Sequence, residues 1–246
     1  MFNFGVMHKE WYDDGNVFMA TLYIVGTPIG NLEDVTLRAL RVLKEVTMVL
    51  CEDTRVTKRL LTKYEITTPV MSYHAQSKLA KVEKILALLE EGNDLALVSD
   101  AGTPCISDPG SLLTKQVLER YGEKVSIVSI PGPSALITAL SSAGISVAEF
   151  TFLGFLPHKK GRETLFKEIA KAERVMVFYE STHRVEKALE SLEKFCGPER
   201  HVIVARELTK IYEEYVRGSI SDVRAHFTKN PDRVRGEFVV IVDRIR

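Results

Sequence analysis

The chain has 246 residues, of which 45% are hydrophobic and 27% charged, and its 33 basic residues equal its 33 acidic ones. This composition is ordinary for a globular protein that buries a sizeable core, and the length allows one large domain or two smaller ones. A net charge of zero argues against a protein whose binding is dominated by attraction to nucleic-acid phosphates, although it is compatible with a local basic face.

The cysteines and the N-terminus indicate the compartment in which we expect the protein to act. Cys51, Cys105 and Cys196 are far apart and form no CxxC pair, as is typical of a reducing cytosol, and they predict no metal site. No apolar run approaches membrane-spanning length, so no membrane partner is expected. Residues 1–20 lack the basic-then-apolar order of a signal peptide, and we expect a flexible extension and a cytoplasmic protein.

From Thr21 onwards, short apolar runs alternate with segments of helical periodicity. The run TLYIVG is β-branched and ends in a glycine, whereas TLRALRVLKEV repeats its apolar residues at helical spacing. Strands are predicted at 21–26, 48–52, 69–74, 94–99 and 124–130, and helices at 36–46, 78–92, 111–122 and 133–144, with a further helix from about Thr57. Because buried strands alternating with helices favour a parallel sheet, residues 21–145 are predicted to form an α/β domain.

The second half has a different pattern, with more strands than helices. Strands are predicted at 149–155, 174–180, 201–207, 210–218 and 236–243, and helices at 183–197 and 219–230. The stretch VARELTKIYEEYVRG indicates two strands joined by a short link, hence an antiparallel hairpin. Residues 146–246 are therefore predicted to form a second α/β domain with a mixed sheet.

Three turns rich in glycine and proline follow strands of the first half, at 26–31, 99–110 and 130–135. Glycine opens backbone angles closed to other residues and proline fixes φ, so such turns hold the main chain in one shape. Ligands of open parallel sheets bind outside the carboxyl ends of the strands. None of the turns matches GxGxxG or GxxxxGK[ST], which excludes a Rossmann dehydrogenase and a P-loop NTPase. A backbone-lined site for a polar, adenosine-like ligand is predicted, with simple tight turns as the alternative.

Seven strings carry a resemblance to a known family: GTPIGNLEDVTLRAL, CEDTR, SDAGTPCISDPG, IPGPSA, YESTHR, ARELTK and GEFVVIV. In order and spacing they resemble the tetrapyrrole-methylase superfamily, and within it most closely the group that methylates small-subunit ribosomal RNA. The resemblance runs from Thr21 to about Asp243. It departs from the family at Thr182, where relatives commonly have proline, and at the end, where many relatives continue into a small helical segment.

The resemblance implies a two-domain tetrapyrrole-methylase-like fold that binds S-adenosylmethionine in the cleft between its domains, in a protein that is usually a homodimer. The implied reaction is methylation of a cytidine ribose 2′-hydroxyl in the decoding region of 16S ribosomal RNA, with the assembled small ribosomal subunit as the expected partner. The residues that the resemblance assigns to the cofactor are Pro28, Ala101, Gly102, Thr103, Ile106, Ser134, Ala135, Phe178, Tyr179, Ala205, Arg206 and Gly236.

A ribose hydroxyl is a poor nucleophile, so a nearby base or a cationic stabiliser is expected. The candidates at predicted strand ends are Glu52, Asp53, Arg55, His74, Asp100, Glu180, His183, Arg184, Arg206 and Glu207. Each has a structural alternative. Asp53 and Arg55 can form a salt bridge or a helix cap, His74 can be an ordinary loop residue, and Asp100 can bind amides of its own turn.

The candidates of the second half have similar alternatives. Glu180 and Arg184 can pair across a helix start, and Arg206 can pair locally with Glu207. The sequence does not decide which group is the base.

Contact with RNA is predicted at the basic loop PHKKGR, through Lys159, Lys160 and Arg162, and at RVRG, residues 233–236. Phosphate contacts from such loops position RNA without reading its sequence. The target cytidine is expected to be splayed out of its stack, as in base-extruding enzymes. Two other functions stay open: methylation of a tetrapyrrole precursor, and a non-catalytic RNA- or nucleotide-binding module on the same fold.

Overall fold

The computed structural model describes residues 20–74, 77–108 and 110–245, which divide into two compact units. Unit 1 comprises the described residues up to Thr27 together with Thr36–Pro131, and unit 2 comprises Pro28–Val35 and the described residues from Gly132. The sequence places the boundary later, after residue 145. The extension predicted for residues 1–20 lies outside the described residues except for Ala20, which begins the first strand.

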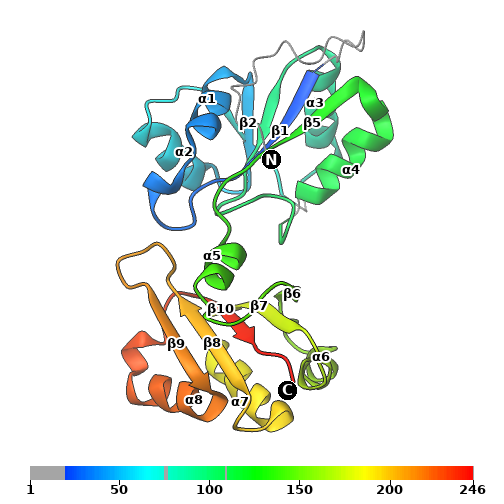
Figure 1. Cartoon of the computed structure of the whole chain (residues 1–246). Coiled ribbons are helices and arrows are strands. Elements are labelled where there is room, and N and C mark those ends of the chain that lie inside the picture. The colour runs from blue at the N-terminus through cyan, green and yellow to red at the C-terminus, as the bar shows by residue number, and fades with distance from the viewer. Residues whose placement is uncertain (1–19, 75–76, 109, 246) are drawn as a thin grey trace, which may run out of the picture. The chain divides into compact units, whose positions relative to one another are not determined.

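Unit 1 is built on a five-stranded sheet whose order is β3-β2-β4-β1-β5 (Figure 1). All neighbouring strands are parallel, which confirms the predicted arrangement. The strands are β1 (Ala20–Val25), β2 (Met48–Cys51), β3 (Val70–Ser72), β4 (Leu95–Leu97) and β5 (Val125–Ile130), and the helices are α1 (Leu37–Glu45), α2 (Thr54–Lys63), α3 (Leu79–Glu90) and α4 (Gly110–Tyr121).

Helices cover both faces of this sheet because the chain changes direction along it. Strands β1, β2 and β3 step towards one edge, whereas β4 and β5 step back. With right-handed crossovers this places α1 and α2 on one face and α3 and α4 on the other. The apolar residues of α3 and α4, such as Leu86, Leu89 and Leu113, accordingly pack in one cluster with Leu22 and Leu97 of the sheet.

Two local details of unit 1 differ from the sequence prediction. Helix α2 begins at Thr54, earlier than the expected start near Thr57, because the Asp53 side chain accepts a hydrogen bond from the Arg55 N–H and caps it. On α3, the helical spacing in the sequence predicts that Leu79, Val82, Leu86 and Leu89 share the apolar face, but Leu79 is exposed and Ile85 is buried. Leu79 is the first residue of the helix.

Unit 2 is built on a mixed sheet of order β6-β7-β10-β8-β9, in which only β6 and β7 are parallel. The hairpin predicted from VARELTKIYEEYVRG is confirmed as β8 and β9. The strands are β6 (Phe150–Phe155), β7 (Val175–Ser181), β8 (His201–Arg206), β9 (Glu214–Ser219) and β10 (Glu237–Val242), and the helices are α5 (Ala135–Ser141), α6 (Arg162–Ala170), α7 (Val185–Cys196) and α8 (Ile220–Lys229).

The two faces of the second sheet have separate cores. Helices α6, α7 and α8 pack on one face, around Phe166, Leu189 and Phe227. Helix α5 and the segment Pro28–Val35, which holds the short 3₁₀ helix η2 (Leu32–Asp34), belong to unit 2, and Leu136 and Ile29 pack on the other face. Helix α6 was not predicted. It is short and buries only Phe166 and Ile169, so its apolar period is brief.

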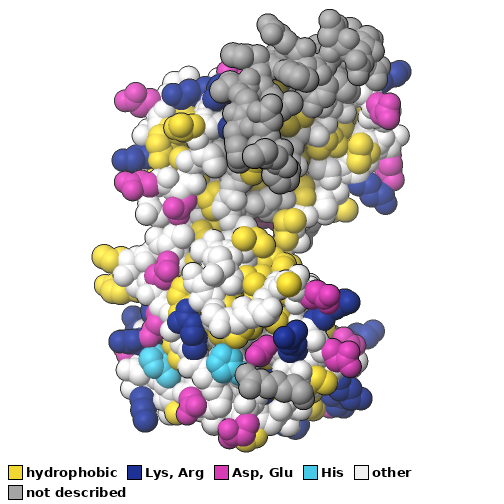
Figure 2. All heavy atoms as spheres, in the orientation of Figure 1, with side chains coloured by type: hydrophobic (Ala, Val, Ile, Leu, Met, Phe, Trp, Pro, Cys, Tyr) yellow, Lys and Arg dark blue, Asp and Glu magenta, His cyan; other side chains and the backbone are white. Residues whose placement is uncertain are grey.

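Charged side chains of both signs are interspersed over the face shown in Figure 2, in keeping with the zero net charge. Within the described ranges, no three histidine, cysteine or acidic side chains gather as metal ligands would. In that same part of the chain no helix is long and apolar enough to cross a membrane.

Candidate functional site

The three glycine-proline turns follow β1, β4 and β5, which are direct neighbours in the sheet of unit 1. Parallel strands end at the same edge, so the three turns leave the sheet side by side. The CEDTR segment follows β2, next to β4, and His74 follows β3. The edge expected to carry the ligand therefore gathers five loops, and the chain passes into unit 2 within two of them, at Pro28 and Gly132.

The first two turns are locked together by a short antiparallel bridge between Thr27 and Gly102. The Thr27 N–H donates to the Gly102 carbonyl at 2.9 Å, and the Gly102 N–H donates to the Thr27 carbonyl at 3.1 Å. The hydroxyls of Thr27 and Ser99 also donate to the Gly102 carbonyl, each at 3.3 Å. Gly102 has φ 81°, a conformation that a side chain strongly disfavours. The glycine is thus required by the turn itself.

The far end of the second turn is fixed by Asp108. Its carboxylate accepts hydrogen bonds from the N–H groups of Cys105, at 2.9 Å, and Gly110, at 2.8 Å, where α4 begins. Cys105 is itself left-handed, with φ 70°. Between these fixed ends Ala101 and Ile106 are exposed. The described residues of SDAGTPCISDPG therefore form a turn that is hydrogen-bonded at both ends and leaves Ala101 and Ile106 accessible between them.

Carboxylates gather at the ends of β2 and β4. The Asp53 N–H donates to Asp100 Oδ1 at 2.9 Å, so Asp100 binds an amide of the neighbouring loop rather than its own turn. Burial first, and then the charges of Asp100 and Asp108, raise the pKa of Glu52. Hydrogen bonds from the Arg55 side chain and N–H lower the pKa of Asp53 to about 2. The salt bridge and helix cap considered for Asp53 and Arg55 are both present, with Arg55 Nη2 at 2.6 Å.

In unit 2, the cofactor candidates on β7 and β8 differ in how far their side chains are buried. Phe178 and Ala205 are completely buried among core side chains, so only their main chain is available to a ligand. Tyr179 is half-buried, with Phe152 and Phe155 edge-on to its ring at centroid distances of 4.9 and 5.4 Å. Its Oη accepts a hydrogen bond from the Leu136 N–H at 3.1 Å, and burial raises its pKa. Tyr179 thereby fixes the start of α5, next to Ser134 and Ala135.

Glu180 is the most deeply buried of the catalytic candidates, with a side chain that is 0% exposed. Arg184 Nη2 donates to its carboxylate at 2.9 Å, and Arg162 Nη1 and Nη2 approach it at 3.4 Å. The same arginines donate to the carbonyls of Leu156 and Pro157. The pairing of Glu180 with Arg184 that was considered as a structural alternative is therefore present, and Arg162, a predicted RNA contact, also pairs with Glu180 through a side chain that is 16% exposed. Lys159 and Lys160 are exposed.

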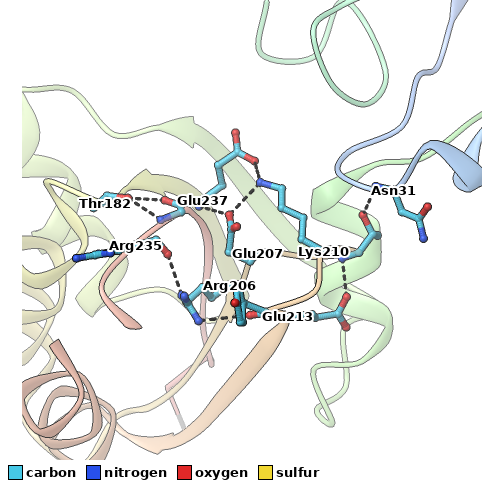
Figure 3. Close-up of polar contacts among 11 residues, drawn as sticks. Asn31, Thr182, Arg206, Glu207, Lys210, Glu213, Arg235 and Glu237 are labelled. Atoms are coloured by element: carbon cyan, nitrogen blue, oxygen red, sulfur yellow. Dashed lines mark hydrogen bonds and ion pairs between the residues drawn. The ribbon is translucent and has the colours of Figure 1, made fainter. Parts of the chain in front are cut away.

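Arg206 and Glu207 do not pair with each other, in contrast to the alternative considered from sequence (Figure 3). Arg206 Nε donates to the Arg235 carbonyl at 2.8 Å, and its Nη1 lies 3.5 Å from Glu214. Glu207 accepts from Lys210 Nζ at 2.9 Å. Burial disfavours its ionisation, but hydrogen bonds from Lys210 and the Glu237 N–H lower its pKa overall. Arg206 and Glu207 thus brace the turn after β8.

The end of GTPIGN, residues 28–31, and the end of ARELTK lie against each other in unit 2, although the sequence gives no reason to pair them. The Asn31 N–H donates to Thr209 Oγ1 at 3.0 Å. A Cβ on Gly30 would stand 2.6 Å from Lys210 Cγ, so only glycine fits there. The only hint of this contact in the sequence is the glycine itself, because Asn31 and Thr209, which form the hydrogen bond, are 178 residues apart.

Thr182, the position where relatives commonly have proline, joins β7 to β10. Its hydroxyl donates to the Gly236 carbonyl and accepts from the Gly236 N–H, both at 2.8 Å.

Thr182→Val keeps the shape of the side chain and removes both hydrogen bonds, and we expect the free energy of unfolding to fall by about 1.5 kcal/mol. Urea denaturation tests this. Thr228→Val, whose hydroxyl bonds only within α8, serves as the matched control and should change little; equal losses in the two variants would contradict the inference.

Gly236 is enclosed by Glu207. It has φ 97°, and an added Cβ would stand 2.2 Å from Glu207 Oε1. Gly236→Ala is therefore expected to destabilise the protein by about 2 kcal/mol, from backbone strain and displacement of the carboxylate. In a Glu207→Ala background the alanine should cost at least about 1 kcal/mol less, because the collision is gone. Identical costs in both backgrounds, measured by denaturation, would show that the collision is not the cause.

Comparisons with known proteins agree with this architecture. The family model for tetrapyrrole (corrin/porphyrin) methylases matches residues 21–224. A Thermotoga maritima protein named Ribosomal RNA small subunit methyltransferase I is 44% identical over 224 residues, 91% of this chain and 98% of its own. A Bacillus subtilis protein of the same name is 42% identical over 239 residues, 97% of this chain and 80% of its own.

Solved structures show the same fold at low sequence identity. Cobalt precorrin-4 methyltransferase, a cobalamin biosynthetic enzyme, superposes with a TM-score of 0.67 at 19% identity, covering 92% of this chain and 95% of its own. Uroporphyrin-III-C-methyltransferase from Thermus thermophilus gives 0.59 at 20% identity, with 91% and 94% covered. By sequence and by fold, the chain belongs to the tetrapyrrole methylase family, and within it to the group of the small-subunit ribosomal RNA methyltransferases I.

Proposed function

We propose that the protein transfers a methyl group from S-adenosylmethionine to the 2′-hydroxyl of a cytidine ribose in the decoding region of 16S ribosomal RNA. The observation that supports this most strongly is the rigid Thr27–Gly102 turn pair at the sheet edge, in a chain that matches ribosomal RNA methyltransferases along almost its whole length. A fixed main-chain cradle suits a reaction whose catalysis is mainly alignment.

The residues present suit this cofactor. S-adenosylmethionine supplies an electrophilic methyl group on a positively charged sulfonium, and the acids at the ends of β2 and β4 complement that charge. The second turn offers main chain and the exposed Ala101 and Ile106. We propose that the cofactor is held by Pro28, Ala101, Gly102, Thr103, Ile106, Ser134, Ala135 and Tyr179, and by main-chain groups at Phe178, Ala205, Arg206 and Gly236.

The surroundings of the acidic candidates narrow the choice of base. Asp53 is held ionised by Arg55 at a pKa of about 2, which makes it a weak base. Glu180 is enclosed by two arginines. Glu52 keeps a raised pKa at the end of β2, closer to the range in which a carboxylate accepts a proton well. We propose that Glu52, with Asp100 beside it, accepts the proton of the ribose hydroxyl, while Arg206 and Glu180 position their loops.

Glu52→Gln is expected to lower kcat about 100-fold and to leave cofactor affinity within a few fold, because the base acts on the hydroxyl. The pKa of Glu52 is raised, so the wild-type rate should increase with pH until that carboxyl is ionised, and the variant should lose this dependence. Methyl-transfer rates across pH test both statements. Glu45→Gln, an exposed glutamate paired with Arg41, is the control; a fall of the same size there would contradict the role of Glu52.

The expected RNA contacts are Lys159 and Lys160, exposed in the loop after β6. We propose that the substrate is the assembled small ribosomal subunit, because two lysines on a neutral protein provide little selectivity of their own. We also propose that the protein is a homodimer and that it acts in the cytoplasm.

A substrate comparison tests the proposed function against its main alternative. The purified protein is incubated with labelled S-adenosylmethionine and, separately, with undermethylated small subunits, free 16S RNA and a tetrapyrrole precursor. Label is expected in RNA of the subunits. Transfer to the tetrapyrrole alone would overturn the proposal in favour of tetrapyrrole methylation.

A further inference from the structure

The turn between β8 and β9 exposes two apolar side chains at its tip. Ile211 is 90% exposed and Tyr212 is 69% exposed. Figure 2 shows hydrophobic side chains projecting where this turn lies in Figure 1. Single exposed apolar residues are common on protein surfaces, but an adjacent aliphatic and aromatic pair at a loop tip is not explained by the fold of unit 2.

The backbone beneath this tip is fixed and strained. Glu207 and Thr209 are non-glycine residues with φ 51° and 65°, conformations that cost free energy and persist only where the surroundings impose them. The Thr209 N–H donates to Glu213 Oε2 at 2.6 Å, and its hydroxyl accepts from the Asn31 N–H at 3.0 Å (Figure 3). Lys210 Nζ binds both Glu207 and Glu237 at 2.9 Å. The tip is therefore held in one conformation.

Arg206 connects this tip to a cation. Its Nη1 donates to the Tyr212 carbonyl at 3.3 Å, and its Nε donates to the Arg235 carbonyl at 2.8 Å. Arg235 is exposed, and its side chain points away from the network in Figure 3. Among the described residues, its guanidinium has no ion-pair partner, whereas the nearby Arg233 pairs with Glu214. The buried Arg206 guanidinium thus donates to the main-chain carbonyl of Tyr212 at the tip and to that of the unpaired Arg235.

We propose that this tip, Ile211 and Tyr212, is a stacking surface for an unstacked nucleobase of the RNA substrate, and that Arg235 contacts a neighbouring phosphate. The proposal rests on the proposed function. An exposed aromatic ring and an exposed cation, whose main chains are joined by the Arg206 guanidinium, match the alternation of flat base and phosphate in single-stranded RNA. A second copy of the chain fits less well, because two side chains cover at most roughly 400 Å², about half of what one partner buries in a stable interface.

The test measures binding of undermethylated small subunits at several salt concentrations. Tyr212→Ala is expected to weaken binding about tenfold at every salt concentration, because stacking releases few ions, whereas Tyr212→Phe keeps the ring and binds normally. Arg235→Gln is expected to reduce the slope of log affinity against log salt by about one contact. The Kd for S-adenosylmethionine should stay unchanged in all three variants. KM for the subunit should rise in Tyr212→Ala while kcat stays within a few fold.

Leu37→Ala provides the matched control, since Leu37 is an 86% exposed apolar residue on α1 of unit 1 and should leave RNA binding unchanged. Unaltered binding in Tyr212→Ala, or equal losses in Leu37→Ala, would overturn the proposal. A change in molar mass in Tyr212→Ala, measured by light scattering, would assign the tip to a protein contact instead. If the wild-type protein methylates no RNA, the proposed function fails separately, whatever the variants bind.

Discussion

Gly102→Val is expected to weaken the binding of S-adenosylmethionine roughly 1,000-fold. Valine at the φ of 81° is strained, and bending the backbone to relieve that strain breaks the two main-chain bonds to Thr27. Strain and lost bonds together cost about 4 kcal/mol, which reduces the population of the competent turn roughly 1,000-fold and raises the apparent Kd in proportion. Isothermal titration with the cofactor measures the effect directly.

A matched control separates the turn from the general cost of the substitution. Gly122 has φ 56° and open space around it, so Gly122→Val introduces comparable strain in unit 1 away from the turns. It should lower stability and leave cofactor affinity near the wild-type value. Equal losses of affinity in both variants would contradict a role for the Gly102 turn. A Gly102→Val protein that binds no cofactor yet restores every cellular function would favour the non-catalytic RNA-binding alternative.

Glu180→Gln is expected to lower the free energy of unfolding by about 3 kcal/mol, because it leaves two arginines in the interior without a counter-charge. The same arginines donate to the carbonyls of Leu156 and Pro157, so the loop carrying Lys159 and Lys160 should also loosen. Urea denaturation measures the first effect. Hydrogen exchange of the amides around residues 157–161 measures the second.

The corresponding control is an exposed glutamate in the same unit. Glu149 is 71% exposed and pairs with Arg174 at 2.8 Å. Exposed pairs contribute little, so Glu149→Gln should change the free energy of unfolding by less than about 1 kcal/mol. A loss in Glu180→Gln no larger than that of the control would contradict the structural role given to the buried cluster.

The fold was predictable from sequence where the apolar residues repeat at a regular spacing over a long segment and where glycine or proline marks the turns. The alternation of short apolar runs with segments of helical periodicity predicted the parallel sheet of unit 1, and the stretch VARELTKIYEEYVRG predicted the β8–β9 hairpin. Helix α6 is absent from the sequence prediction because only Phe166 and Ile169 are buried and its N-cap residue, Gly161, has no side chain that could cap it. The membership of Pro28–Val35 and α5 in unit 2 depends on long-range packing of Ile29 and Leu136, which local patterns do not encode.

The sequence predicted which loops form the candidate site, but not which residues in them form hydrogen bonds or ion pairs with one another. The sequence placed Asp53 and Asp100 at the ends of two strands. The structure makes those strands neighbours, which explains the bond from the Asp53 N–H to Asp100. It could not show that Arg162 turns inward to Glu180, because a basic residue in a basic loop is ordinarily exposed. Nor could it show that Arg206 braces Tyr212 and Arg235, since those contacts are main-chain carbonyls, one in the loop after β8 and the other just before β10.

The most direct test of the central claim is to locate the methyl group. Small subunits from cells lacking the gene are incubated with the protein and labelled S-adenosylmethionine, and the 16S RNA is then digested and analysed by mass spectrometry. The proposed function predicts label on the ribose of one decoding-region cytidine, with little or none on free RNA. Label on a base, or no label on RNA in either form from a protein that binds the cofactor, would contradict it.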